Sequence, residues 1–353
     1  MSRRVLIARL DGAGDVLLAG PAVRAVAAAP GVEAVLLCGP QGAAAGRLLP
    51  GVAQVLEWPC PWILNPAPEP TPDLMQALLQ LVRSARTEEA VILTSFHQSP
   101  LPLALLLRDA GIRTITAAST DYAGTLLTTR LKPGEDFPED QPEAERALRI
   151  AAAAGFALPA GDDGRLRLGP LPDVSPLVGT GPYIVVHPGA AVPARAWPAL
   201  HHAAAVELLT AAGFRVVVTG GPGEKELTAT VAAVAGLDLG GRTDLAALAA
   251  VLAGADAVVV GNTGPAHLAA AAGTPVVSLF APVVPAIRWA PYRVPLELLG
   301  EQHAACSGTR ARTCPVSGHP CLSGVSPEQV VEAVQRLVNG VPSLQTHREM
   351  RHR

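Results

Sequence analysis

The chain has 353 residues, more than a single hydrophobic core usually serves, so two domains are expected. Hydrophobic residues make up 49% and charged residues 16% of the sequence, which excludes extensive disorder. The formal net charge is −3 and no segment concentrates basic residues, which argues against nucleic acid as a partner.

The N-terminus begins with basic residues and a short apolar run at 5–8, but Arg9 and Asp11 end that run too early for an export signal. No apolar stretch reaches the roughly 20 residues that a bilayer-spanning helix needs. The five cysteines are an odd number, which favours reduced thiols. We therefore expect a soluble cytoplasmic protein, which leaves room for peripheral contact with the inner face of the cytoplasmic membrane.

Residues 1–165 are expected to form a first α/β domain. Continuous apolar runs predict buried strands of a parallel sheet, at residues 5–8, 34–38 and 90–95. Helical patterns follow at residues 15–29 and 141–155. The proline-rich segment 58–70 cannot enter a central strand or a helix interior, so we expect a surface insertion there.

A second α/β series follows a linker rich in glycine and proline at residues 166–181. The second domain spans 182–325, with strands expected at residues 183–186, 215–219, 257–261 and 275–280. Ser326 as N-cap and Pro327 at the first position predict a closing helix within 326–340, followed by a flexible tail at 341–353. Two doubly wound halves of this kind bind ligands at the carboxyl ends of their strands.

Four sequence blocks, in order, are Arg9 to Leu17 (RLDGAGDVL), His187 to Ala190 (HPGA) with Arg195 to Pro198 (RAWP), Gly220 to Glu224 (GGPGE), and Gly261 to His267 (GNTGPAH). Together they resemble glycosyltransferase family 9, which includes the lipopolysaccharide heptosyltransferases, over most of the chain. The resemblance implies the GT-B fold, in which two Rossmann-like doubly wound domains face a central cleft. It also implies a metal-independent glycosyltransferase that acts on a cell-envelope glycan.

Asp15 follows the first predicted strand, where Gly12 and Gly14 allow a tight turn. The resemblance implies that Asp15 is the general base, which takes the proton of an acceptor hydroxyl as its oxygen attacks the anomeric carbon with inversion. Such a base contributes about 10²- to 10⁴-fold in rate. The alternative is a carboxylate that only complements a helix dipole. Asp11 is the neighbouring candidate base.

The Gly261 to His267 block lies where a strand meets a helix, and a helix N-terminus can bind a diphosphate through backbone N–H groups. The implied donor-binding residues here are Asn262, Thr263, Gly264, Pro265 and His267. Asn262 stands where the family usually has an aspartate, so it keeps hydrogen bonding but loses the charge. The alternative is an ordinary turn with Asn262 or Thr263 as N-cap and a buried His267.

Arg195 matches a family lysine that engages donor phosphate, and the resemblance implies that it stabilises the departing diphosphate. The alternative is a solvated arginine before a helix that starts near Pro198. The other implied donor-binding residues are Gly14, His187, Gly189, Glu224 as a ribose ligand, and Thr243 near the nucleotide base. Glu224 could equally be a first-turn helix residue.

The first domain is expected to bind the acceptor, a glycan or glycolipid, through the segment from Ser95 to Ser99, although an ordinary loop is as good an interpretation. Cys306, Cys314 and Cys321 with His319 lack the C-x₂-C spacing of zinc sites, so no metal is expected. No cofactor is implied beyond the nucleotide-diphosphate sugar, for which heptose and an ADP group are candidates.

Three functions remain open at this point. The first is an inverting glycosyltransferase, which the resemblance favours. The second is a catalytically silent nucleotide-sugar-binding protein, which the replacement of an aspartate by Asn262 suggests. The third is a dinucleotide-dependent oxidoreductase, suggested by Gly12 and Gly14, although Leu17 occupies the place of the third glycine in that fingerprint.

Overall fold

The chain folds into two compact units, one ending at Gly169 and the other beginning at Pro170. The structure is a computed structural model that describes residues 3–233 and 235–340. Each unit contains one six-stranded sheet, and the strands of both sheets pair in parallel. The predicted fold class, α/β with two Rossmann-like doubly wound domains, is confirmed. The expected tail at 341–353 lies outside the described residues.

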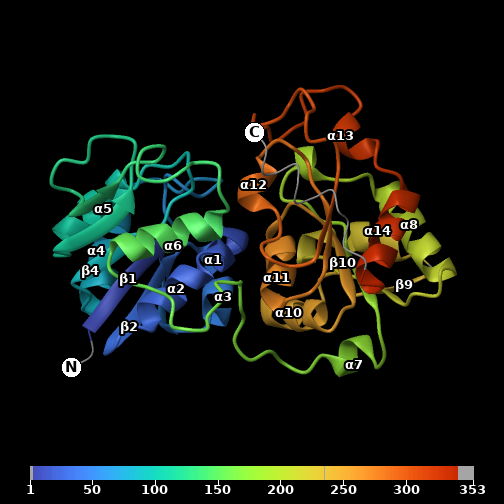
Figure 1. Ribbon diagram of the computed structural model, residues 1–353, viewed down its shortest axis with the longest axis horizontal. Coiled ribbons are helices and arrows are strands. Elements are labelled where there is room, and N and C mark those ends of the chain that lie inside the picture. Colours follow the sequence, from blue (N-terminus) through green and yellow to red (C-terminus); the bar gives the residue numbers. More distant parts are fainter. Residues whose placement is uncertain (1–2, 234, 341–353) are drawn as a thin grey trace. The chain divides into compact units, whose positions relative to one another are not determined.

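The sheet of the first unit has the order β3-β2-β1-β4-β5-β6. Its strands are β1 (Arg3–Arg9), β2 (Val32–Cys38), β3 (Val52–Glu57), β4 (Glu89–Ile92), β5 (Thr114–Ala118) and β6 (Thr129–Leu131). One face is covered by α1 (Ala13–Leu18), α2 (Gly20–Ala27), α3 (Pro40–Leu48) and α6 (Glu143–Ala153), and the other by α4 (Pro72–Ala85) and α5 (Leu101–Asp109) (Figure 1). Helices on both faces explain why the central strands are continuously apolar.

One prediction for the first unit was wrong, and another holds for only part of its segment. The expected helix over 15–29 is two helices that meet at Ala19, because Pro21 has no N–H to continue the hydrogen-bond ladder. The proline-rich segment is not simply a surface insertion. Trp58 and Cys60 are 2% and 0% exposed and belong to the hydrophobic core, because this stretch follows β3 directly and its apolar side chains extend the buried face.

The second sheet has the order β12-β11-β10-β7-β8-β9. Its strands are β7 (Ile184–His187), β8 (Val216–Val218), β9 (Gly236–Asp238), β10 (Ala257–Gly261), β11 (Val276–Leu279) and β12 (Leu296–Leu299). The main helices are α8 (Ala199–Ala211), α9 (Lys225–Ala232) and α14 (Pro327–Val338), which pack together in one core, and α10 (Leu245–Ala253) and α11 (Gly264–Ala272), which pack against each other.

The shorter helical pieces are α7 (Ser175–Val178), α12 (Ala286–Trp289) and α13 (Pro320–Ser323), with 3₁₀ turns at Pro193–Arg195 and Pro222–Glu224. The predicted closing helix is confirmed as α14, in which the Ser326 hydroxyl accepts a hydrogen bond from Gln329 N at 3.3 Å. Among residues 3–233 and 235–340, no helix has the length and apolar character needed to cross a membrane.

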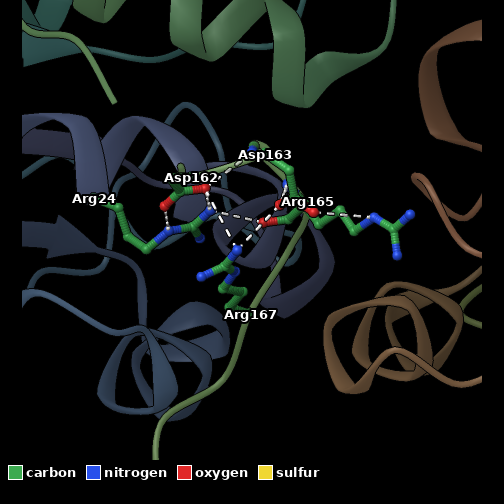
Figure 2. Close-up of polar contacts among 6 residues, drawn as sticks. Arg24, Asp162, Asp163, Arg165 and Arg167 are labelled. Atoms are coloured by element: carbon green, nitrogen blue, oxygen red, sulfur yellow. Dashed lines mark hydrogen bonds and ion pairs between the residues drawn. The ribbon is translucent and has the colours of Figure 1, made fainter. Parts of the chain in front are cut away.

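The segment that ends the first unit is fastened to α2 by an ion pair (Figure 2). Arg24 donates from Nε and Nη2 to the Asp162 carboxylate at 2.7 and 2.9 Å, and from Nη2 to Arg165 O at 2.8 Å. A bidentate pair of this kind fixes both the position and the orientation of the segment.

In each sheet the strand order reverses beside the first strand of the unit, between β1 and β4 and between β7 and β10. Ligands of open α/β sheets bind at such switch points, at the carboxyl ends of the strands. The residues that follow β1, β4, β7 and β10 are therefore expected to form the ligand-binding sites.

Candidate functional site

A buried arginine at the carboxyl end of β1 gathers three carboxylates. Arg9 is 2% exposed. Its Nε lies 2.9 Å from Asp11 Oδ2, its Nη2 lies 2.8 Å from Asp15 Oδ1, and its Nη1 lies 3.5 Å from Glu143 Oε2. Burial disfavours the charged guanidinium, but the three carboxylates outweigh that effect and raise the pKa of Arg9. Arg9 therefore stays charged and holds Asp11 and Asp15 at one edge of the sheet.

The two candidate bases differ in their accessibility. The Asp11 side chain is 12% exposed, and both of its oxygens are engaged, Oδ1 by Gln98 Nε2 at 2.5 Å and Oδ2 by Arg9. Burial raises the pKa of Asp11, an effect that Arg9 opposes. The Asp15 side chain is 28% exposed, and within the described part of the chain no hydrogen bond reaches its Oδ2. Asp15 is thus the carboxylate that a ligand can approach.

The predicted acceptor segment is linked to these carboxylates. Ser95 Oγ accepts a hydrogen bond from Arg9 Nη2 at 2.8 Å, and Ser95 N donates to Gln98 Oε1 at 3.0 Å. Gln98 in turn donates to Asp11. The loop after β4 and the turn after β1 are therefore one hydrogen-bonded assembly at the switch point of the first sheet.

In the second unit, the predicted phosphate-binding turn joins β10 to α11. Thr263 is the N-cap residue of α11, with φ −145° and ψ 174°, and its side chain makes no capping hydrogen bond. Pro265 has no N–H, and Ala266 N donates to Thr263 O at 3.0 Å. Within the described residues this leaves the Gly264 N–H as the backbone donor at the helix start. His267, in the first turn of α11, is 6% exposed.

The side chain of Asn262 is engaged by the backbone of the neighbouring strand. Its Nδ2 donates to Ala281 O at 3.1 Å, and its Oδ1 accepts from Ala281 N at 3.4 Å. Asn262 is 5% exposed. An amide can donate and accept at the same time, which an ionised carboxylate cannot. The side chain therefore ties the end of β10 to the segment after β11.

Arg195 lies beside this turn. It ends the 3₁₀ turn Pro193–Arg195, and its Nη1 donates to Asn262 O at 3.4 Å. Arg195 is half-buried. Trp197 is 3% exposed and donates from Nε1 to Val325 O at 3.1 Å, so it is a packing residue, as expected. The structure thus brings Arg195 and the turn together, as the sequence blocks suggested.

Gly189 and Glu224 are in direct contact. A Cβ atom at Gly189 would lie 2.1 Å from Glu224 Oε1, so no larger residue is accommodated without moving the carboxylate. Glu224 Oε2 accepts a hydrogen bond from Gly221 N at 2.7 Å. The Glu224 carboxylate therefore lies over the turn that follows β7 and is held there by its own helix start.

His187 is the last residue of β7 and is 5% exposed, with Nδ1 lying 3.0 Å from Thr219 Oγ1. Burial lowers the pKa of His187 to about 4, although Glu224 opposes the shift. His187 is consequently neutral near pH 7 and supports the turns above it without adding positive charge.

Two predicted donor-binding residues, Thr243 and Gly14, lie outside the contacts described above. Gly241 N donates to Gly220 O at 2.8 Å, which brings the turn containing Thr243 beside the Gly220 turn. Thr243 itself precedes Asp244, the N-cap residue of α10. Gly14 belongs to α1 in the first unit.

The three late cysteines are structural neighbours of the second core. Cys306 and Cys321 are buried within it, and Cys314 donates from Sγ to Val316 O at 3.3 Å. His319 Nε2 lies 3.1 Å from Ala194 O. Over residues 3–233 and 235–340, no group of three or more His, Cys, Asp or Glu residues is placed to hold a metal ion.

The sequence interpretation gave no role to Arg9 or Glu143. A charged residue at the end of a buried apolar strand was the available signal, because such a residue needs partners of opposite charge. Glu143, however, is 134 residues away along the chain, and nothing in its local sequence marks it as a partner of Arg9.

The chain is similar to known proteins of one family. The model of glycosyltransferase family 9 (heptosyltransferase) matches residues 105–319. Two curated relatives are lipopolysaccharide heptosyltransferase 3 of Escherichia coli, 31% identical over 104 residues, and lipooligosaccharide heptosyltransferase 2 of Haemophilus influenzae, 30% identical over 117 residues. These matches cover 28% and 31% of this chain and only about a third of each relative, 31% and 34%.

The structure of E. coli ADP-heptose lps heptosyltransferase II superposes with a TM-score of 0.73 at 19% identity, covering 96% of this chain and 99% of that one. At this identity the likeness concerns the fold, and it confirms the predicted GT-B class.

Proposed function

Because this chain belongs to glycosyltransferase family 9, we propose that it is an enzyme that moves a sugar from a nucleoside-diphosphate donor to a hydroxyl group of a glycan or glycolipid acceptor. We further propose ADP-heptose as the donor, since both curated relatives are named heptosyltransferases and the solved homologue is named for ADP-heptose. The observation that carries the proposal is the Asp15 carboxylate, oriented by buried Arg9 and open on one oxygen at the switch point of the first sheet.

In the proposed reaction, Asp15 Oδ2 removes the proton from the acceptor hydroxyl as the acceptor oxygen bonds to the anomeric carbon. The bond between that carbon and the diphosphate breaks, and the diphosphate leaves with the electron pair. Attack opposite the leaving group inverts the anomeric configuration. Arg9 holds Asp15 in one orientation throughout, and such a base contributes about 10²- to 10⁴-fold in rate.

The diphosphate is proposed to bind at the start of α11. The Gly264 N–H and the Thr263 hydroxyl are donors there, and the positive end of the helix dipole favours an anion. Arg195, which reaches Asn262 O in this turn, adds a positive charge that stabilises the departing diphosphate. Glu224, lying over Gly189, is proposed to accept hydrogen bonds from the ribose hydroxyls, with Thr243 near the base.

The proposal is tested by thermal unfolding with a panel of nucleotide sugars, followed by measurement of nucleoside diphosphate release with glycan acceptors. A true donor at about 100 times its dissociation constant should add about 2.7 kcal/mol to the free energy of unfolding. Gly189→Ala, which displaces the Glu224 carboxylate, should abolish most of this stabilisation, while Gly169→Ala at the end of the first unit, where an added Cβ meets only an ordinary contact, should not.

The outcomes separate the competing functions. Stabilisation by a nucleotide sugar without transfer to any acceptor would identify a silent binding protein instead of an enzyme. Stabilisation by NAD(P) and by no nucleotide sugar would favour the oxidoreductase. The proposed transferase requires both donor-dependent stabilisation and release of the nucleoside diphosphate with formation of a glycoside of inverted configuration.

A further inference from the structure

The histidine at position 319, just before α13, has a left-handed backbone. Its φ is 51° and its ψ is 50°, a conformation that glycine adopts freely and that a Cβ atom makes unfavourable. The next residue is Pro320, and a residue before proline favours extended backbone instead. Glycine would therefore suit the backbone at this position better than histidine does, so the imidazole is expected to have a task that offsets this cost.

The imidazole of His319 contacts the 3₁₀ turn that carries Arg195. Its Nε2 lies 3.1 Å from the carbonyl oxygen of Ala194, the central residue of the turn Pro193–Arg195. A carbonyl oxygen only accepts hydrogen bonds, so Nε2 is the donor in this contact. Ala194 is 1% exposed, so water cannot readily replace the imidazole as the partner of this oxygen.

The loop that contains His319 also holds the other polar group of Ala194. Ala194 N donates to Arg312 O at 3.0 Å, so both the N–H and the carbonyl of this residue are bonded to the loop. The loop is itself anchored in the core of the second unit, because Cys306 and Cys321 are 1% and 2% exposed and belong to that core. The turn is therefore held by a fixed part of the same unit.

The turn also adjoins the proposed phosphate-binding residues. Arg195 Nη1 donates to Asn262 O at 3.4 Å, and a Cβ atom at Gly261 would lie 3.3 Å from Arg195 O. A cationic group stabilises a departing diphosphate only when it is held in place, and a displacement of about 1 Å can cost about 10²-fold in rate. Because Ala194 directly precedes Arg195, a shift of the turn would move the guanidinium with it.

We propose that His319 is a positioning residue for Arg195, and that it holds the turn Pro193–Arg195 where the guanidinium meets the diphosphate of the donor. The hydrogen bond from His319 Nε2 to Ala194 O performs this task. His319 acts through Arg195 and not on the donor itself. The inference rests on the proposed function, because it deepens the role that Arg195 has there.

Two substitutions separate the hydrogen bond from the backbone conformation. The amide nitrogen of glutamine can take the place of Nε2, so His319→Gln should keep the contact with Ala194 O. Asparagine is too short to reach that oxygen, although it adopts a left-handed backbone more readily than glutamine does. If the hydrogen bond carries the role, His319→Gln should resemble the wild type and His319→Asn should not. The reverse order would refute the proposal.

The turn is monitored without any turnover by hydrogen–deuterium exchange on the full chain. The N–H groups of Arg195 and Ala196 form backbone hydrogen bonds of 3.0 and 3.1 Å within this turn. They should exchange at least about fivefold faster in His319→Asn than in the wild type or His319→Gln. His303→Asn, at an exposed histidine of the same unit, is the control and should leave exchange unchanged. If His319→Asn does not fold, His319→Gly takes its place, since glycine suits the left-handed backbone. Equal exchange in every variant would overturn the proposal.

A double-mutant cycle tests whether His319 acts through Arg195. With a donor and an acceptor that react, His319→Asn should lower kcat by about 10- to 10²-fold. It should leave the acceptor KM within about twofold of the wild-type value. In an Arg195→Met background, where the guanidinium is already absent, the same substitution should lower kcat by less than about a further twofold. Equal losses in both backgrounds would show that His319 acts independently of Arg195, and would refute the assignment.

The outcomes keep this inference apart from the proposed function. If Arg195→Met transfers sugar as fast as the wild type, the role of His319 is wrong and the transferase stands. If no nucleoside diphosphate is ever released, the transferase is wrong, and the same cycle measured on the dissociation constant of ADP decides the role of His319 by itself. A loss of ADP affinity in His319→Asn that disappears in the Arg195→Met background would support it. Absence of ADP binding to the wild type would overturn it.

Discussion

Arg9 Nη2 donates to Asp15 Oδ1 at 2.8 Å, while the Nε of the same guanidinium lies 2.9 Å from Asp11 Oδ2. One rigid, planar group thus sets the positions of two carboxylates that are close in sequence but differ in exposure. The geometry assigns them different tasks. Asp11 is enclosed and connects β1 to the loop after β4, whereas Asp15 keeps one oxygen open to a ligand.

The first prediction concerns these two carboxylates. Asp15→Asn should lower kcat by about 10²- to 10⁴-fold, because an amide cannot accept the hydroxyl proton. Its nucleotide-sugar dissociation constant should stay within about twofold of the wild-type value, since every proposed donor contact except Gly14 lies in the other unit. Asp11→Asn is the matched control and should retain more activity than Asp15→Asn. The reverse order in steady-state kinetics would make Asp11 the base.

Replacing Arg9 tests how the cluster is stabilised. Arg9→Met leaves three carboxylates without their cation, two of them largely buried, and should lower the free energy of unfolding by about 3–5 kcal/mol. Lys132→Met is the control, because Lys132 lies in the same unit and pairs with Glu135 while both side chains are exposed, 46% and 68%. It should cost less than about 1 kcal/mol. Equal losses in denaturant unfolding would contradict this view of Arg9.

The sequence predicted the parts of this fold whose signal is local. The run at 257–261 became β10 with the expected bounds, and Ser326 caps α14 as expected, because burial and capping depend on neighbouring residues. Strand β9 (Gly236–Asp238) has no apolar run and was not foreseen, since its pairing with β8 is decided by the rest of the sheet.

Some features of the candidate site were also predictable from local sequence, and others were not. The strand-to-helix turn at 261–267 was predictable, and so was its neighbour Arg195 once the blocks were compared with a family. The contacts that define the roles were not. The side chain of Asn262 is held by the backbone of Ala281, and the buried charge of Arg9 is balanced in part by Glu143. These are tertiary contacts that no local sequence pattern specifies.

Asn262→Asp tests whether the amide has a structural task. The carboxylate can still accept from Ala281 N, but it cannot donate to Ala281 O and would place negative charge against that carbonyl. We expect the free energy of unfolding to fall by about 1–3 kcal/mol. Because the side chain is engaged in this contact, kcat per folded molecule should change less than about threefold. A large loss of kcat with unchanged stability would assign Asn262 to the donor.

His202 should make the second unit sensitive to acid. It is 2% exposed, its ring packs on Trp197 with centroids 4.7 Å apart, and burial lowers its pKa to about 3, with His187 acting in the same direction. Because the folded pKa lies below the unfolded value of about 6.5, the stability is complete above that pH and is lost as the pH falls from 6.5 towards 3.

His202→Phe keeps an aromatic ring but removes this titration. Relative to the wild type, the variant should gain about 2–3 kcal/mol in free energy of unfolding between pH 7 and pH 4.5, measured by denaturant titration. His303→Phe, at an exposed histidine of the same unit, is the control and should leave the pH dependence as it is. Parallel pH curves for wild type and His202→Phe would show that protonation of His202 does not destabilise the fold.

The ion pair in Figure 2 lies in the first unit. It predicts that this unit, like the second, loses stability as the pH falls. Hydrogen bonds from Arg24 lower the pKa of Asp162 to about 2, and the Asp162 side chain is 7% exposed. A depressed carboxyl pKa stabilises the fold above the unfolded value of about 4, and this stability is lost as the pH falls from 4 towards 2. Asp162→Asn should therefore cost about 2 kcal/mol at pH 7 and almost nothing near pH 2.

Asp163→Asn is the matched control, because the Asp163 side chain is 50% exposed and its contacts are with exposed Arg165 and Arg167. It should leave the free energy of unfolding at pH 7 close to the wild-type value, because ion pairs between exposed side chains contribute little. An Asp162→Asn deficit that stays constant from pH 7 to pH 2 would mean that the residue acts through packing of its side chain. A difference in free energy of unfolding that disappears as the pH falls requires the charge of Asp162. That result would identify the ion pair with Arg24 as the contact that holds this segment against α2.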